Sequence, residues 1–366
     1  MGKIDELIKQ FCPNGVEVVE LGKIAKLVRG KVISKKYVLD NNGEYPVYSS
    51  QTSNNGEFGR INTYMFDGDY VTWTTDGAYA GTVFRRTGKF NITNICGLIK
   101  LEVSSINVGF LYYWLAITAK KYVNRATDNP KLMSNVVATI KVPLPPLAVQ
   151  KKIVEILDTF TGMIDNLQKE LEQRQKQFEY YRSKFFAYNE DECDWFSLPM
   201  ISENCDRKRK PIKGSKREKG IYPYYGASGI VDYVKDYILD GEYLLISEDG
   251  ANLVARNTPI AFSIEGKNWV NNHAHVVKFN SLNDQRFVEY YFNSIDLTPW
   301  ISGGAQPKLN QENLNKILIP YPSVERRNII VDTLKSFEAL ISNIKQEIEL
   351  RQKQYEYYRE KLLTFE

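Results

Sequence analysis

The chain of 366 residues repeats itself at an offset of nearly half its own length. The segment RQKQFEYYR begins at Arg174, and the segment RQKQYEYYR begins at Arg351. A repeated unit of this size indicates a duplicated domain rather than a solenoid repeat. Other matches at the same offset are Pro143–Pro145 with Pro320–Pro322, Pro130–Leu132 with Pro307–Leu309, and Tyr45–Pro46 with Tyr222–Pro223.

Between these anchors the register of the repeat slips by four positions. Gly68–Tyr70 matches Gly241–Tyr243, and Asp76–Ala78 matches Asp249–Ala251. A change of loop length in one copy produces such a slip. The ends of the two copies are nearly identical, whereas the middles share only scattered glycines, prolines and aromatic residues. Uneven drift is one interpretation. We favour the other, in which the ends meet a common partner and each middle meets a different target.

The last third of each copy has the apolar spacing of a coiled-coil helix. Apolar positions recur in alternating steps of four and three over more than four heptads, without an intervening proline. Gly162 is the one weak helix former on the first seam. The first seam consists of Ile153, Leu157, Phe160, Ile164, Leu167, Leu171, Arg174, Phe178, Tyr181 and Phe185, and the second of Ile330, Leu334, Phe337, Ile341, Ile344, Ile348, Arg351, Tyr355, Tyr358 and Leu362.

Two such seams in one chain most simply pair with each other. A helix with one seam is about 50 Å long at 1.5 Å per residue, and a twofold-like repeat makes the pairing antiparallel. Arg174 and Arg351 are the charged seam residues, and a polar group at a core position typically sets helix register; a contact to a partner subunit is the alternative. Residues 1–11 align with residues 178–188, so a short N-terminal helix carrying Ile4 and Ile8 is expected to complete the coiled coil.

The middle of each copy is predicted to be a globular α+β domain. Short β-like runs such as Tyr70–Trp73 and Tyr243–Ile246 are separated by Asn-Gly, Asp-Gly and Gly-Gly turns. Helical patterns follow near Val108–Val123 and Arg286–Ser294, and prolines stop the preceding segment before each long helix. The predicted domains are a globular domain at 1–145, a helix at 146–189, a second globular domain at 190–321 and a second helix at 322–366.

Composition limits the class of protein. The net charge of +4 is only mildly basic, so a nucleic-acid surface must be local. The first eleven residues lack the apolar region of a secretory signal, and no run of 18 apolar residues occurs. The four cysteines have neither metal-site nor disulfide-framework spacing. A cytoplasmic protein with free thiols is the simplest interpretation.

The order of the segments resembles the specificity subunit of type I restriction-modification enzymes over the whole chain. A globular domain is followed by PLPPLAVQKKIVEILD and a long helix ending in RQKQFEYYRSKFF, and a second domain by YPSVERRNIIVDTL and a helix ending in RQKQYEYYREKLLTF. The segments GAQPKL (304–309) and DNPKL (128–132) resemble the loop that precedes the last strand in this family. The second copy departs from the usual acidic-Gln pair, with Val324–Arg327, and the first has Val149–Gln150.

The resemblance implies a non-catalytic subunit with two α/β target recognition domains joined by an antiparallel coiled coil. Each domain would read one half of a split, asymmetric site in double-stranded DNA. The helices would fix the spacer between the halves and dock two methyltransferase subunits, which carry S-adenosylmethionine. Restriction subunits, which use ATP and Mg, would join that core. The chain itself would hold no cofactor and no metal.

Basic clusters at matched positions favour a grip on DNA phosphates in both copies. Residues 206–219 hold eight Lys or Arg and two acids. The alternative is a solvated loop. The predicted contacts are Arg207, Lys208, Arg209, Lys210 and Lys213 in the second copy, and Arg29, Lys31, Lys35 and Lys36 in the equivalent stretch of the first.

The Asp-Gly-Ala loops are further candidates, because Asp and Asn pair with base edges and Gly allows close approach. A tight β-turn is the alternative. Sequence cannot separate contacts that position the DNA from contacts that read it. The loop candidates are Asp76, Tyr79 and Asn252, and the additional phosphate or base contacts are Arg85, Arg86, Lys131, Arg256, His273 and Lys308.

A catalytic function has no support in the sequence. Asn129–Lys131 lacks the second proline and the aromatic residue of an adenine methyltransferase motif, and no phosphate-binding GxxxxGK[ST] loop occurs. Two histidines, His273 and His275, without a pattern of carboxylates make a zinc site improbable. The rival hypotheses are a coiled-coil scaffold whose heads bind proteins, and a fused restriction enzyme, which would carry catalytic motifs.

Overall fold

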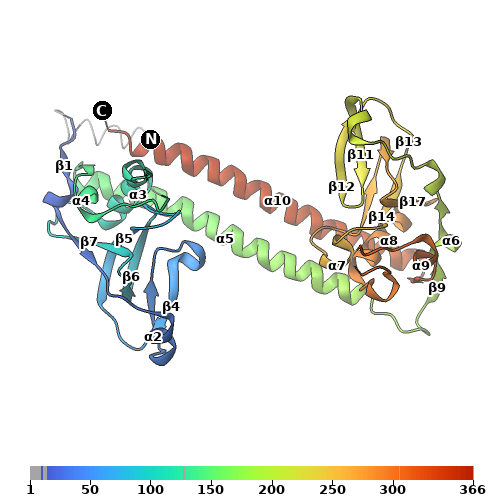
Figure 1. The fold of residues 1–366 in the computed structure, drawn as a ribbon, viewed down its shortest axis with the longest axis horizontal. Helices are drawn as coiled ribbons and strands as arrows, with labels where there is room; N and C mark the ends of the chain where they lie inside the picture. Colours follow the sequence, from blue (N-terminus) through green and yellow to red (C-terminus); the bar gives the residue numbers. More distant parts are fainter. Residues whose placement is uncertain (1–9, 11–14, 127, 305, 366) are drawn as a thin grey trace. The chain divides into compact units, whose positions relative to one another are not determined.

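The structure, a computed structural model, describes residue 10 and residues 15–126, 128–304 and 306–365. The chain divides into two compact units, of which unit 1 comprises Met1–Leu167 and Glu347–Glu366 and unit 2 comprises Gln168–Gln346. Each unit contains one globular head and one half of each long helix, α5 (Leu147–Phe185) and α10 (Val324–Leu362) (Figure 1). The expected N-terminal helix with Ile4 and Ile8 lies outside the described residues.

Head 1, the globular part of unit 1, is built on a six-stranded sheet in the order β2-β7-β5-β6-β3-β4. Its pairs are antiparallel except for β3 with β6, which is parallel. A separate antiparallel pair, β1 with β8, joins the start of the head to the residues before α5. The strands are β1 (Val18–Glu20), β2 (Ala25–Arg29), β3 (Tyr45–Tyr48), β4 (Glu57–Ile61), β5 (Phe66–Thr74), β6 (Val83–Ile92), β7 (Cys96–Leu101) and β8 (Lys141–Pro143).

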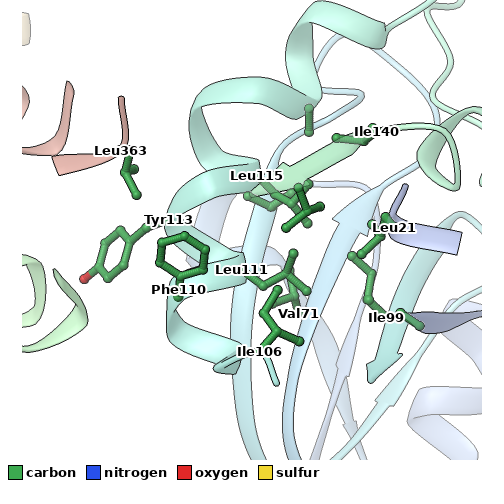
Figure 2. Close-up of a cluster of buried hydrophobic side chains, with 14 of the residues drawn as sticks. Leu21, Val71, Ile99, Ile106, Phe110, Leu111, Tyr113, Leu115, Ile140 and Leu363 are labelled. Carbon is green, nitrogen blue, oxygen red and sulfur yellow. The ribbon is translucent and has the colours of Figure 1, made fainter. Parts of the chain in front are cut away.

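The core of unit 1 lies where α3 (Val108–Thr118) packs on β5 and β6. Phe110 and Leu111 of α3 are fully buried against Val71 of β5, and Leu363, just after α10, belongs to the same cluster. Figure 2 shows these side chains converging from helix and sheet. The other helices of head 1 are short: η1 (Leu21–Lys23), α2 (Lys35–Asp40), η2 (Ser53–Gly56), η3 (Ala119–Tyr122) and α4 (Ser134–Val137).

Head 2, the globular part of unit 2, has two four-stranded sheets, β10-β17-β14-β15 and β12-β11-β16-β13, and the antiparallel pair β9 with β18. Its strands are β9 (Asp194–Ser197), β10 (Glu203–Asn204), β11 (Lys219–Gly226), β12 (Gly229–Val234), β13 (Leu239–Asp240), β14 (Tyr243–Ser247), β15 (Ala261–Ile264), β16 (Lys267–Val270), β17 (Ala274–Lys278) and β18 (Leu318–Tyr321). Its helices are α6 (Leu198–Ile201), η4 (Asp206–Lys208), η5 (Gly214–Lys216), α7 (Asn252–Ala255), α8 (Leu282–Ser294), η6 (Thr298–Trp300) and α9 (Gln311–Asn315).

The two heads share one topology. The parallel pairing of Val47 with Asn91 in head 1 recurs as Tyr224 with Trp269 in head 2. The counterparts of β5 and β6 are interrupted in head 2, at residues 241–242 and 265–266, where Gly241 and Gly266 have positive φ. These breaks divide the equivalent of the six-stranded sheet into two sheets. The duplication inferred from the sequence is therefore a duplication of structure.

The four-position slip in the repeat is a change of hairpin length, as expected. Eight residues separate the paired residues Tyr48 and Glu57 in head 1, and four separate Tyr225 and Ile230 in head 2. Head 2 regains residues after the Asp249 loop, where α7 has no counterpart in head 1. Both changes lie in connections between strands, which tolerate insertions better than the strands themselves.

The long helices form the predicted antiparallel pair. In unit 1, Ile153 and Leu157 of α5 pack in one core cluster with Tyr355 and Tyr358 of α10. In unit 2 the opposite halves meet, and Phe178 of α5 packs in the cluster that holds Ile330 and Leu334. The early half of each helix thus pairs with the late half of the other. All twenty seam positions are buried or half-buried except Tyr181, which is 37% exposed. The α+β fold class with two paired helices is confirmed.

The two departures from the family pattern at the helix starts have the same structural role. Gln150 and Arg327 occupy equivalent positions of the two copies, and both are buried. The side chain of Gln150 donates to the carbonyl of Pro145, and that of Arg327 donates to the carbonyl of Pro322. Each side chain therefore fixes the proline-rich entry onto the first turn of its helix, although one is an amide and the other is a cation paired with Asp284.

Candidate nucleic-acid interface

Two loops that are far apart in sequence meet in head 1. The amide of Gly77, in the Asp-Gly-Ala loop after β5, donates to the carbonyl of Pro130 at 3.0 Å. The amide of Leu132 donates to the carbonyl of Thr75 at 2.8 Å, so the loop and the Pro-Lys-Leu segment form a short antiparallel bridge. Backbone bonds on both sides of Lys131 fix the direction in which its side chain leaves the backbone.

Head 2 repeats this arrangement bond for bond. Gly250 donates to the carbonyl of Pro307 at 3.1 Å, and Leu309 donates to the carbonyl of Glu248 at 2.7 Å. The bridge pairs Asp249 with Lys308, as it pairs Asp76 with Lys131 in head 1. The sequence singled out both loops in each copy, and the fold brings them together.

A third backbone segment closes each bridge from the other side. Lys131 exchanges two backbone hydrogen bonds with Asn124, both of 2.9 Å. Lys308 exchanges two with Ser302, of 2.7 and 2.8 Å. Each lysine therefore occupies the middle of three adjacent segments. Both lysine side chains remain about half exposed, at 49% and 50%.

The basic stretches approach the same edge of the two heads. In head 1, Lys31 forms a bridge with Thr93, at the end of β6. Gly30 allows this crossing, since a Cβ there would lie 2.0 Å from the carbonyl oxygen of Ile92. In head 2 the amide of Lys210 donates to the carbonyl of Val270, at the end of β16. The matched basic positions inferred from sequence therefore lie at matched positions in space.

The electrostatic centre of the head 1 surface is Asp76. Arg29 lies 3.8 Å and Lys131 3.9 Å from its carboxylate, and all three side chains are at least partly exposed. Arg29 also donates to the carbonyl of Asn94. Tyr79, in the same loop, is 58% exposed. Two cations, a carboxylate and an exposed ring thus share one surface, which offers donors, acceptors and a stacking face to a ligand.

Head 2 has different side chains on the same backbone frame. Glu248 replaces Thr75 and forms ion pairs with Arg209 and with Lys308, the latter at 3.1 Å. His273 contacts Asp249 at 2.9 Å and is half exposed. Burial raises the pKa of Glu248, but the hydrogen bond from Arg209, the charge of His275 and the bond from Lys308 outweigh it and hold this pKa below its ordinary value. The carboxylate is therefore ionised at neutral pH.

Other residues of the predicted set are exposed on the basic stretches. In head 1, Lys35 and Lys36 are exposed at the start of α2. In head 2, the exposed residues are Arg207, Lys208, Lys210 and Lys213. Arg209 differs, because its side chain is only 15% exposed and it donates to the carbonyl of Ala274.

Four predicted contacts make internal interactions instead of facing solvent freely. Arg85 is paired with Asp69 at 2.7 Å. Arg86 is 3% exposed and lies over the rings of Tyr48 and Phe84, and burial lowers its pKa. Arg256 donates to backbone carbonyls at the end of α8, and Asn252 exchanges hydrogen bonds with Thr258. Their contact with DNA stays a prediction, and these bonds give each a structural role.

Glu248 and Asp206 are the polar residues of this surface that sequence reasoning missed. Glu248 directly precedes the Asp-Gly-Ala loop, and its partners Arg209 and Lys308 come from distant segments on either side of it in the chain. Asp206 opens the basic stretch and was counted there as one of two acids, without a role. Only the pairing of distant segments reveals that both carboxylates organise those cations.

The described part of the chain holds no group of three or more His, Cys, Asp or Glu side chains placed to bind a metal ion. Within that same part, no helix has the length and apolar character needed to span a membrane. Cys96, Cys193 and Cys205 are free thiols. Burial raises the pKa of Cys96 to about 12, so this thiol is inert at neutral pH.

Comparisons with known proteins agree with this architecture. The family model described as "Type I restriction modification DNA specificity domain" matches residues 13–174 and again residues 196–350. A putative type I specificity subunit of Mycoplasma pneumoniae is 31% identical over 364 residues, covering 96% of this chain and 98% of that protein. The specificity subunit of the MpnII type I restriction enzyme, from the same organism, is 41% identical over 180 residues, covering 48% of this chain and 54% of that one.

Solved structures show the same fold. The crystal structure of the specificity subunit of a type I restriction-modification system from M. genitalium has a TM-score of 0.68 and 15% identity, covering 96% of this chain and 97% of that one. A duplicated head with two long helices therefore defines a two-headed, coiled-coil specificity-subunit fold. The chain belongs to the type I restriction-modification specificity subunit family. Membership implies that it confers DNA target specificity on a type I complex.

Proposed function

We propose that each head binds one half of a bipartite, asymmetric site in double-stranded DNA. The paired helices set the spacer between the halves and dock two methyltransferase subunits. Restriction subunits join that complex, and the partners hold S-adenosylmethionine, ATP and Mg. The chain contributes specificity and no catalytic group of its own.

The observation that carries this proposal is one backbone frame with two sets of side chains. Both heads make the same hydrogen bonds at Gly77 and Gly250 and present a half-exposed lysine from the same position. Around this frame, head 1 has Arg29 and Tyr79, whereas head 2 has Glu248 and His273. A constant frame supports a common mode of docking, and variable donors and acceptors support the reading of different bases.

The half-exposed lysines and the flanking basic stretches suit phosphate binding. The amines of Lys131 and Lys308, paired with carboxylates at 3.9 Å and 3.1 Å, can exchange those partners for a phosphate oxygen without moving the backbone. Before DNA binds, these carboxylates also reduce the repulsion between neighbouring cations. The mild overall charge of +4 agrees with a local rather than a global DNA surface.

Two measurements test the proposal. Anisotropy of fluorescent duplex DNA across a salt series, with the methyltransferase subunit present, is expected to show affinity that falls linearly with the logarithm of salt concentration. Methylome sequencing of cells with and without this chain is expected to show one bipartite motif that depends on it. Salt-independent binding, or no binding, would instead support a scaffold whose heads bind proteins.

A head exchange tests which half-site sequence is recognised, and a helix insertion tests the spacer length. Replacing residues 190–321 with those of a relative is expected to change one half-site only. Inserting one heptad between Leu167 and Leu171, with a matched heptad between Ile344 and Ile348, is expected to lengthen the spacer by about 3 base pairs, since seven residues add about 10 Å. A changed half-site after the insertion would refute the role of the helices as a spacer.

A further inference from the structure

One backbone carbonyl in each head is held by the N–H of a ring. In head 1 the indole Nε1–H of Trp73 donates to the carbonyl of Leu132 at 3.0 Å. In head 2 the imidazole Nε2 of His275 lies 2.8 Å from the carbonyl oxygen of Leu309. Leu132 and Leu309 follow Lys131 and Lys308 directly and are equivalent positions of the repeat. These two bonds therefore anchor the Pro-Lys-Leu segment to the sheet in each head.

The two rings come from opposite members of the same cross-strand pair. Trp73 of β5 faces Gly97 of β7, and Ile246 of β14 faces His275 of β17. A Cβ at Gly97 would lie 2.2 Å from the Trp73 ring, so head 1 has no room for a side chain there. Each head therefore places one ring at this cross-strand pair, on β5 in head 1 and on β17, the counterpart of β7, in head 2.

Both ring nitrogens of His275 face hydrogen-bond acceptors. Nδ1 lies 2.7 Å from Oδ2 of Asp206, and Nε2 faces a carbonyl oxygen, which can only accept. Asp206 is ionised, since its other oxygen accepts from the amide of Val276 and Arg209 lies 3.1 Å away. Burial raises the pKa of Asp206, but the bond from His275 and these contacts hold it below its ordinary value. The Nε2 nitrogen must therefore donate.

Charged groups from several segments lie near this ring. Asp206 comes from η4, and Arg209 follows it. Glu248, just after β14, lies 3.9 Å from Nδ1 and binds Lys308. At the surface, His273 pairs with Asp249. The His275 ring is 1% exposed, and it contacts Asp206 of the basic stretch and the carbonyl of Leu309 in the Pro-Lys-Leu segment.

We propose that His275 is a positioning residue of head 2, whose ring holds Lys308 and the bridged Asp249 loop in the geometry for DNA binding, and that Trp73 has this role in head 1. The assignment rests on the proposed function. Loss of either ring N–H leaves a backbone carbonyl without its donor, so the Pro-Lys-Leu segment of that head loses its anchor to the sheet.

The free protein provides the first test, because the chain has only two histidines. Ring ¹⁵N spectra of histidine-labelled protein are expected to show a proton on Nε2 of His275 at neutral pH, and this signal persists in the His273→Gln variant. Hydrogen exchange of the Lys308 and Leu309 amides is expected to accelerate in His275→Gln. The Lys131 and Leu132 amides are the internal reference. An unprotonated Nε2 of His275, or unchanged exchange, would overturn the assignment.

The second test measures the two half-sites in one complex. His275→Gln is expected to reduce discrimination at one half-site about tenfold, because the Pro-Lys-Leu segment bridges the Asp249 loop, which holds the candidate base contacts, and to leave the other half-site unchanged. Trp73→Phe, which keeps an aromatic side chain and removes the N–H, is expected to affect the opposite half-site. Loss of discrimination at both half-sites in either single variant refutes the proposal.

The two tests separate the two proposals. No specific methylation by the wild-type complex would sink the proposed function, whereas the spectra and the exchange data still decide the anchoring role of His275. Specific methylation with an unprotonated Nε2 of His275 would sink this inference alone.

Discussion

The ring of Phe160 stacks on the ring of Tyr358, with centroids 5.3 Å apart and an interplanar angle of 21°. The repeat produces the same pair again, since Phe337 and Tyr181 stack at 5.5 Å and 27°. Each pair joins the early half of one long helix to the late half of the other. The same ring contact therefore occurs at equivalent positions of the antiparallel coiled coil in both units.

Truncation of these rings should destabilise the two units equally. We expect Phe160→Ala and Phe337→Ala each to lower the free energy of unfolding by about 2–3 kcal/mol, because half-buried stacked rings lose less than the roughly 3–5 kcal/mol of a full core truncation. Urea unfolding measures the loss. Glu172→Ala, at an exposed position of α5, is the control. Unequal losses would indicate that the two contacts are not equivalent.

We expect the seam arginines to lower the stability of the helix pair and to define its register. Arg174 and Arg351 pair with Glu170 and Glu347 on their own helices and donate to Gln177 and Gln354. Replacing both arginines with Leu is expected to stabilise the helices while allowing other registers or oligomers. Urea unfolding and light scattering measure the two effects. A more stable protein that remains uniformly monomeric would leave the arginines without a role in register.

The half-exposed lysines should contribute to the salt dependence of DNA binding. We expect Lys131→Ala and Lys308→Ala each to reduce the slope of log affinity against log salt by about 1, as one phosphate contact is lost. The double variant should show the sum. Lys316→Ala, directly after α9, removes a lysine paired with Glu312; it is the matched control and should leave the slope unchanged. Anisotropy titrations at several salt concentrations measure the slope.

Acid should weaken unit 2 through Asp206. A carboxylate whose folded-state pKa is lowered contributes stability that is fully present above its unfolded pKa of about 4 and is lost as pH falls through the folded value. We expect Asp206→Asn to be less stable at pH 7 by about 3 kcal/mol, since His275 and Arg209 lose their partner. The difference in the free energy of unfolding between the wild type and Asp206→Asn should decrease below pH 4. Urea unfolding from pH 7 to pH 3 measures it, and a constant difference would contradict the linkage.

Much of the architecture could be predicted because its signals are periodic or repeated. The alternation of steps of four and three places Ile153 and Leu157 on one stripe, and the stripe must be covered whatever the details of its partner. The β-like runs at Tyr70–Trp73 and Tyr243–Ile246 lie in β5 and β14, because β-branched and aromatic residues pack well on the pleated surface of a sheet. The interruption of the head 2 sheet at Gly241 and Gly266 was not predicted, because a glycine signals a turn without fixing which strands separate.

The polar site was predictable only in outline. Matched positions identified Lys131 and Lys308, but not that each lies between two other segments. Arg85 and Arg86 are adjacent in sequence and were treated alike, yet one pairs with Asp69 and the other is buried over Tyr48. Side chains on a strand alternate between faces, and the face that each meets depends on the rest of the fold.

The sequence by itself determined the duplication, the helical seams and the family, because these depend on residue spacing along the chain. Tertiary structure alone decided which polar groups meet. In the sequence, His275 entered only the argument against a zinc site, and Trp73 was only the end of a β-like run. Only the pairing of β5 with β7 and of β14 with β17 shows that the two rings contact equivalent carbonyls, those of Leu132 and Leu309. Hydrogen bonds act over about 3 Å, and the fold determines which residues of a long chain come that close.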